Sequence, residues 1–155
     1  KKLKERGIKE KLYIIGEGEE RVKLEENIKK LGLEKDVLLL GKLKNPYPFF
    51  KNAKLFVHTA KYEGLPTVLL ESLTLGTPVV AYDCPTGPKD ILGQNSEYGK
   101  LIPLNDKDTF VKEVYELMKN DEKYENYRKI SLVRADDFSL QNNKAKLQAL
   151  IENIK

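Results

Sequence analysis

The chain has 155 residues, of which 40% are hydrophobic and 34% are charged, and its formal net charge is +4. A chain of this length can form one domain with its own core, and no apolar run is long enough to predict a transmembrane helix. The mild positive charge comes from lysines interleaved with glutamates, as on exposed helix faces, so nucleic acid binding is not indicated. The basic N-terminus lacks the apolar region of a secretory signal.

The N-terminal segment KKLKERG, residues 1–7, is typical of the last turns of a helix that ends at a glycine. The first residue is Lys1 and not methionine. We therefore expect this domain to have been cut from a longer protein.

Five apolar runs of strand length follow and do not alternate with polar residues, as is typical of strands buried on both faces. They are LYIIG at 12–16, VLLLG at 37–41, LFVHTA at 55–60, PVVAYD at 78–83 and KLIPL at 100–104. Segments with helical spacing alternate with them, at 19–31, at 66–75 and as two or three helices over 106–155. This order predicts an α/β fold in a single domain over residues 1–155, with a Rossmann-like parallel sheet covered by helices on both faces.

The last predicted helix carries an apolar stripe formed by Leu140, Leu147, Leu150, Ile151 and Ile154. A short helix is expected near Tyr47, Phe49 and Phe50, whose rings would anchor it to the sheet, although one of them could instead stack on a nucleotide base. The single cysteine, Cys84, excludes an internal disulfide and favours a reducing, cytoplasmic compartment. We interpret it as a small loop residue and not as a nucleophile.

Ligands of an open parallel sheet bind beyond the carboxyl ends of its strands. The loop after the third strand leads into EGLPTVLLES, residues 63–72. Gly64 permits a close approach by a ligand, and Pro66 suits the first position of a helix. The amides of Leu65, Thr67 and Val68 would then be free at a helix start, which is a favourable place for a phosphate.

Glu71 would share a helix face with Thr67 and point back toward the same helix start. A rise of ~1.5 Å per residue puts Glu71 about 7 Å beyond Pro66, which is about the span from a diphosphate to a ribose. A carboxylate there can accept hydrogen bonds from the ribose hydroxyls. Glu63 would lie on the other side of the phosphates. Taken singly, however, either glutamate has the ordinary interpretation of an exposed acidic side chain.

Other polar residues have mainly structural interpretations. His58, the only histidine, ends a strand close to these residues, and we expect it to pack or to form a hydrogen bond. The acidic residues lack the spacing of a metal-binding loop, so we expect no metal and no cofactor. The GEG sequence at Gly16 is a weak indication of a ligand and more often only turns the chain.

The whole string EGLPTVLLESLTLGTPVVAYD resembles the signature of retaining GT-B glycosyltransferases of the family 4 type, an E-x7-E motif followed by a G-x-P-V-V strand. LYIIGEGEERVKLEENIKKLGL and VLLLGKLKNPYPFFKNAKLFVHTAKYEG resemble the segments that precede it in that family, and DCPTGPKDILGQNSEYGKLIPLND resembles the one that follows. The resemblance covers residues 5–155 and implies the C-terminal, donor-binding half of a GT-B fold.

The resemblance also implies roles for individual residues. Glu63 would contact the hydroxyls of the donor sugar and stabilise charge as the bond to the diphosphate breaks, and Glu71 would hold the ribose. The backbone at Gly64, Leu65, Pro66, Thr67 and Val68 would hold phosphates or the sugar. The base would lie against Lys42 and Leu43, and Gly16 would approach the same donor site.

The family's first strand of this domain, which carries an Arg and a Lys that neutralise the diphosphate, is missing from the chain. The N-terminal domain that binds the acceptor is missing as well, so we expect little or no activity from residues 1–155 alone. The resemblance implies a bacterial, cytoplasmic hexosyltransferase that uses a nucleotide-diphosphate sugar and acts on a glycan or lipid-linked acceptor in polysaccharide biosynthesis. Peripheral association with the inner face of the membrane is compatible with it.

Two alternatives stay open. A nucleotide-sugar epimerase of the same architecture would need more acid and base groups than one histidine supplies. An α/β interaction module without a nucleotide would resemble a receiver domain, whose acidic cluster and lysine fit IIGEGEE poorly. Neither the sugar, the base, the acceptor nor the oligomeric state follows from the sequence.

Overall fold

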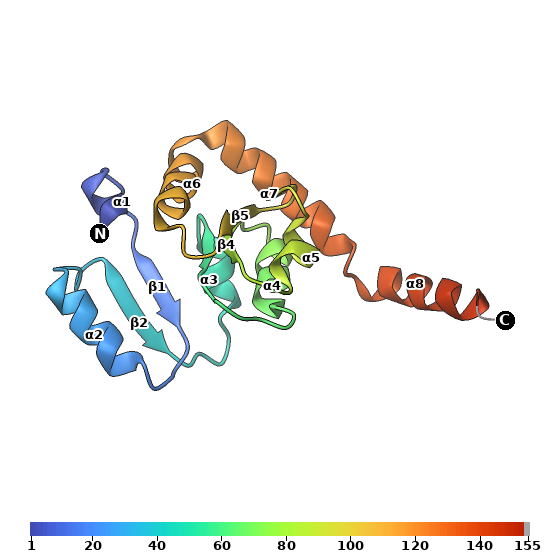
Figure 1. The fold of residues 1–155 in the computed structure, drawn as a ribbon, viewed down its shortest axis with the longest axis horizontal. Coiled ribbons are helices and arrows are strands. Elements are labelled where there is room, and N and C mark those ends of the chain that lie inside the picture. Colours follow the sequence, from blue (N-terminus) through green and yellow to red (C-terminus); the bar gives the residue numbers. More distant parts are fainter. Residues whose placement is uncertain (154–155) are drawn as a thin grey trace. The chain divides into compact units, whose positions relative to one another are not determined.

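The structure, a computed structural model, describes residues 1–153, which form two compact units (Figure 1). The first unit comprises residues 1–48 and the second begins at Phe49. Ile154, which we expected on the last helix, lies outside the described residues.

The first unit is built around a pair of parallel strands, β1 (Leu12–Ile15) and β2 (Val37–Gly41). They pair in a register that sets Leu12 opposite Val37. The short helix α1 (Lys2–Glu5) precedes β1, and α2 (Arg21–Lys30) connects the two strands. Both helices are followed by glycines with positive φ, Gly7 at 84° and Gly32 at 65°, which confirms the helix ends predicted from the sequence.

The second unit contains a three-stranded parallel sheet in the order β3-β4-β5. Its strands are β3 (Phe56–His58), β4 (Val79–Asp83) and β5 (Lys100–Pro103). Its helices are α4 (Thr67–Thr74), α5 (Pro88–Leu92), α6 (Lys107–Lys119), α7 (Asp121–Asp136) and α8 (Leu140–Glu152). The helix α3 (Tyr47–Asn52) spans the change from the first unit to the second.

The α/β class with parallel strands and helices on both faces is confirmed. The hydrogen-bonded strands form two sheets, β1-β2 and β3-β4-β5, in place of the single sheet that we expected. The apolar runs located all five strands, but a hydrophobic pattern carries no information about which strands exchange hydrogen bonds. The predicted strand 55–60 is shorter in the structure because only Phe56–His58 pairs with β4.

Three helices follow β5, as the sequence predicted for residues 106–155. Each begins at a residue whose side chain accepts a hydrogen bond from a backbone amide in the first turn. Asp106 accepts from Thr109 N, Asn120 from Lys123 N and Ser139 from Asn142 N. These caps divide one long polar stretch of the sequence into α6, α7 and α8.

The core of the second unit lies between β4 and the helices α4 and α5. Its fully buried side chains are Leu69, Leu73, Val79, Ala81, Ile91 and Leu92, each at 0% exposure. Two buried hydroxyls in this region are paired: Ser72 Oγ donates to Thr77 O at 2.9 Å, and Thr77 Oγ1 donates to Phe50 O at 2.7 Å. These bonds connect the end of α4, the approach to β4 and the end of α3.

An ion-pair cluster joins β5 to α6 and α7. Glu113 Oε2 lies 3.1 Å from Lys100 Nζ and 3.5 Å from Lys123 Nζ, and its side chain is 17% exposed. Burial by itself would raise the pKa of Glu113, but the hydrogen bonds and charges of the two lysines outweigh it and lower the pKa below its ordinary value of 4.5. The ionised carboxylate therefore stabilises the fold.

We expect Glu113→Gln to lower the free energy of unfolding by about 1–2 kcal/mol near neutral pH, because Gln carries no charge to form an ion pair with either lysine. A lowered carboxyl pKa contributes stability above its unfolded value, and this contribution disappears as the pH falls through the folded value. Urea unfolding of the wild type and the variant should therefore differ at neutral pH, and the difference should shrink as the pH falls below the ordinary carboxyl value of 4.5. Glu116→Gln on the same helix is the control, and a constant difference at all pH values would contradict the assignment.

Candidate functional site

The loop after β3 leads into the start of α4. Pro66 precedes the helix with φ −74° and ψ 84°, and no side chain caps this end. The first turn closes with Leu69 N donating to Pro66 O at 2.9 Å. Within residues 1–153, the amides of Leu65, Thr67 and Val68 have no acceptor. The helix start therefore presents free N–H groups together with the positive end of the helix dipole.

Glu71 lies one helical turn after Thr67 on the same side of α4. The opposite side of the helix is buried through Leu69, Ser72 and Leu73. Glu71 is itself half-buried, yet its carboxylate has no hydrogen-bond or ion-pair partner in the described part of the chain. A half-buried carboxylate without a partner can accept hydrogen bonds from a ligand.

Glu63 is held at two points in the loop that precedes α4. Its carboxylate Oε1 lies 3.2 Å from His58 Nε2, at the end of β3. Its backbone oxygen accepts a hydrogen bond from Thr86 Oγ1. The Glu63 side chain is 30% exposed, so a ligand can reach the part of the carboxylate that His58 does not contact.

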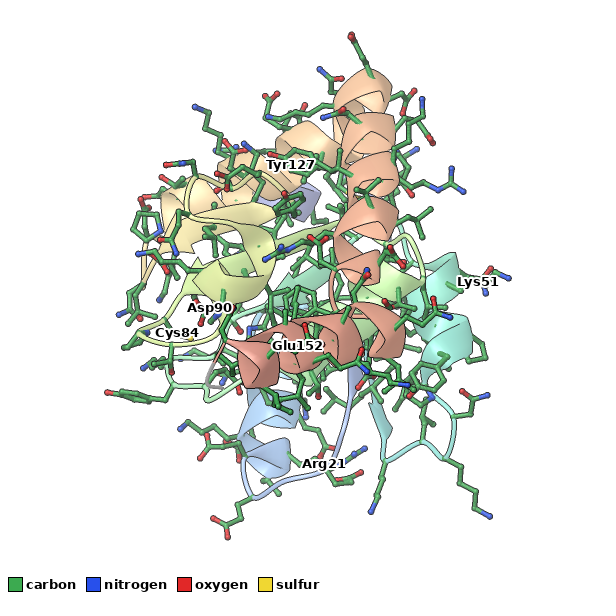
Figure 2. All side chains as sticks on the ribbon, turned by 90° about the vertical axis from the view of Figure 1, so that its right-hand side faces the viewer. Arg21, Lys51, Cys84, Asp90, Tyr127 and Glu152 are labelled. Atoms are coloured by element: carbon green, nitrogen blue, oxygen red, sulfur yellow. The ribbon has the colours of Figure 1, made fainter. Side chains whose placement is uncertain are left out.

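The loop between β4 and α5 packs against Gly64 and Pro66 at the start of α4. The sequence analysis did not assign this loop to the site. Gly87 has φ +92°, and a Cβ at this position would lie 2.3 Å from Pro66 Cδ and 2.7 Å from Gly64 O. Figure 2 labels Cys84 and Asp90, which bracket this segment. This contact joins residues more than twenty positions apart and therefore has no local signature in the sequence.

The remaining predicted site residues form a separate group in the first unit. Gly16 follows β1 with φ +132°, and its amide donates to Gly41 O at 2.8 Å. Lys42 and Leu43 follow Gly41 directly, Lys42 exposed and Leu43 half-buried. Parallel pairing thus brings Gly16 to the same strand edge as the two base-binding candidates.

Next to Gly16, the first unit has an open hollow of about 260 Å³. Its polar lining consists mainly of Glu17, Glu20 and Arg21. Arg21 is fully engaged with its own helix and loop, at 2.6 Å from Glu17 and 2.9 Å from Glu25. Glu20 pairs with Lys23 at 2.8 Å, so each charged side chain that lines the hollow already has an ion-pair partner.

The predictions for the aromatic residues of α3 and for Cys84 had mixed outcomes. Phe50 is buried with its ring 5.0 Å from that of Phe56, so it anchors α3, but Tyr47 and Phe49 are exposed and our prediction that all three rings pack on the sheet was wrong. Their hydrophobicity suggested burial, whereas α3 is short and turns only one aromatic side chain inward. Cys84 is buried, with Sγ 3.6 Å from Thr86 O.

Within residues 1–153, no cluster of three or more His, Cys, Asp or Glu side chains is arranged to hold a metal ion. None of the helices in this range combines the length and apolarity needed to cross a bilayer.

The comparison with protein families gives a match over residues 1–132, to the family described as "Glycosyl transferases group 1". An uncharacterized glycosyltransferase of Methanocaldococcus jannaschii is 46% identical over 92 residues, covering 59% of this chain and 23% of that protein. A Campylobacter jejuni α-1,4-N-acetyl-D-galactosaminyltransferase that acts on an undecaprenol-linked glycan is 34% identical over 150 residues, covering 94% of this chain and 40% of that protein.

Solved structures agree with this result. The crystal structure of TarM matches with a TM-score of 0.85 and 26% identity, covering 96% of this chain and 30% of the TarM chain. A Staphylococcus aureus TarM mutant in complex with UDP and alpha-GlcNAc-glycerol matches with a TM-score of 0.81 and 28% identity, covering 90% of this chain and 28% of that one. The chain thus spans well under half of these relatives. Because the family match covers most of the chain and extends across both units, we conclude that this chain belongs to the glycosyl transferases group 1 family.

Proposed function

We propose that residues 1–155 form one domain, the nucleotide-sugar-binding C-terminal half of a retaining GT-B glycosyltransferase of the family 4 type. The observation that carries the proposal is the start of α4, where unpaired backbone amides and the unpaired Glu71 carboxylate lie along one helix. The amides are donors for an anion, and the Glu71 carboxylate is an acceptor for hydroxyls. They lie about 7 Å apart along the helix axis, which fits the diphosphate and ribose of a nucleotide sugar.

In this proposal, Glu63 and Glu71 are the two acidic residues of an E-x7-E motif. Glu71 accepts hydrogen bonds from the ribose hydroxyls. Glu63 contacts the sugar hydroxyls, and its negative charge stabilises the positive charge that develops on the sugar as the bond to the diphosphate breaks. The anchored loop around Glu63 suits this role, because electrostatic stabilisation requires groups that are fixed before the reaction.

The leaving diphosphate would be stabilised by the α4 start, with Gly64, Leu65, Pro66, Thr67 and Val68 as its frame. The helix dipole and free amides supply partial positive charge without a metal ion. An Arg/Lys pair from a part of the enzyme outside this chain would complete the neutralisation. The base would lie against Lys42 and Leu43 near Gly16. A single family match across both units supports assigning the two residue groups to one domain.

We also propose an N-terminal domain of the same enzyme as the partner that supplies the acceptor site. The chain covers 40% or less of its relatives in C. jejuni and M. jannaschii. The helix α8 extends away from the sheet of the second unit (Figure 1) and exposes Leu140 at 85%, Leu147 at 57% and Leu150 at 59%. Such an apolar surface is suited to packing against another part of the same protein.

The acceptor would be a glycan or lipid-linked glycan. This inference rests on relatives whose names include an undecaprenol-linked glycan in C. jejuni and poly(ribitol-phosphate) in S. aureus. A cytoplasmic enzyme at the inner face of the membrane would meet such acceptors. Neither the epimerase nor the interaction module gains support from the family assignment, and the anomeric configuration of the product from the intact enzyme separates transfer with retention from epimerisation.

The donor site can be tested by titrating the chain with UDP, GDP, ADP and their sugar derivatives and following amide chemical shifts. We expect chemical-shift changes centred on residues 64–71 and 42–43. The nucleotide that binds most strongly identifies the base that the site recognises. Glu71→Ala should weaken binding about tenfold or more, because hydrogen bonds to a charged group are lost, whereas Glu116→Gln should leave it unchanged. Absence of shifts in a chain extended by the preceding strand would contradict the proposal.

The loop behind the helix start gives a second test. Gly87→Ala should destabilise the protein by at least about 2 kcal/mol, since alanine disfavours φ +92° and its Cβ would strike Pro66 and Gly64 O. It should also weaken nucleotide binding by displacing the amides. The control is Gly18→Ala, where a Cβ would meet nothing within 4 Å and φ is not in the positive range. Equal unfolding free energies for the two variants would refute this role of Gly87.

A further inference from the structure

His58 lies at the end of β3, where it pairs with Ala81 of the neighbouring strand. Its side chain is only 11% exposed, and its ring centroid lies 6.3 Å from that of Phe56. Nε2 reaches Glu63 Oε1 at 3.2 Å, across the loop that leaves the strand. The end of β3 thus holds the His58 ring in contact with the Glu63 carboxylate, which is more exposed than the ring.

The other ring nitrogen determines which form of the imidazole fits this place. His58 Nδ1 is buried and is the one buried side-chain nitrogen or oxygen in residues 1–153 that has no hydrogen-bond partner. A protonated Nδ1 would be a buried donor without an acceptor, which proteins avoid more strictly than an unsatisfied acceptor. The proton of a neutral ring therefore belongs on Nε2, where Glu63 can accept it.

We propose that His58 is a positioning residue for Glu63, acting as a neutral imidazole whose Nε2–H donates to Oε1. This inference rests on the function proposed for Glu63. The bond fixes the direction of the carboxylate and leaves Oε2 for the ligand. A neutral donor does so without cancelling the negative charge, which a lysine or arginine at this position would reduce.

The same geometry predicts that position 58 is not optimised for stability. Leucine would fill a similar volume beside Phe56 and would remove the buried unpaired nitrogen. A histidine retained at a cost to stability is typical of residues that serve a site. Stability and catalysis should therefore respond to substitution in opposite directions.

The test compares three substitutions in the intact enzyme that contains this chain. We expect His58→Leu to melt no lower than the wild type but to lower kcat about ten- to a hundredfold, because Glu63 loses its fixed direction, with little change in KM for the donor. His58→Gln, whose amide nitrogen can replace Nε2, should restore most of kcat. His58→Asn, whose amide is too short, should not, and Thr59→Ala next to it is the control.

An independent readout is the tautomer of the wild-type ring, measured from its ¹⁵N chemical shifts near neutral pH. We expect the proton on Nε2 and a shift of that nitrogen in Glu63→Ala. A proton on Nδ1, a doubly protonated ring, or wild-type kcat in His58→Leu would overturn the inference. If the wild-type enzyme transferred no sugar from any nucleotide sugar, the proposed function itself would be wrong. An active enzyme whose kcat does not change on substitution of His58 would overturn only the inference about His58.

Discussion

The candidate site depends on the packing of α4, because that helix is fixed by its buried side and presents the candidate ligand-binding groups on the other. Leu69 and Leu73 are completely buried among β4 and α5, and Ser72 bonds to the chain beyond the helix end. A helix held in this way cannot rotate, so Glu71 has a fixed direction. Its first amides are likewise fixed at the carboxyl edge of the sheet, where a parallel arrangement offers its ligand sites.

The end of α5 is secured from a third element, α7. Arg134 donates from Nε to Ile91 O at 2.8 Å and from Nη2 to Asp90 O, and its guanidinium lies 4.7 Å from the Tyr98 ring. Those carbonyls lie in the last turn of α5, where a cation is favourable. The loop that begins at Cys84 and contacts Pro66 therefore runs between two anchored elements, and the shape of the α4 start is set by residues distributed over half of the second unit.

The sequence predicted the elements well because their signals are local. Continuous apolar runs located the strands, although Leu12 and Tyr13 of β1 are exposed and this strand is not buried on both faces as we expected. Pro66 and Gly32 marked helix boundaries through backbone chemistry alone. The residues grouped at the α4 start could be predicted for the same reason, since they are neighbours along one helix. What they bind is a proposal.

Features that depend on tertiary contacts could not be predicted in this way. Hydrogen bonding between strands divided the expected sheet into two, and no pattern of hydrophobicity encodes that pairing. The contact of Gly87 with Pro66 and the partner of His58 arise where separate loops meet. Tyr47 and Phe49 were misassigned because an aromatic residue in a short helix has no periodicity long enough to show its direction.

The buried position of Cys84 has a consequence for observing the site in motion. Its thiol lies at the base of the loop that supports Glu63 and Pro66, with Sγ close to Thr86 O. A thiol reagent can reach it only when that loop opens, so the labelling rate measures the opening equilibrium when reclosure is fast. These 155 residues thus carry a single, site-specific reporter of loop opening, with no other cysteine among them to obscure its signal.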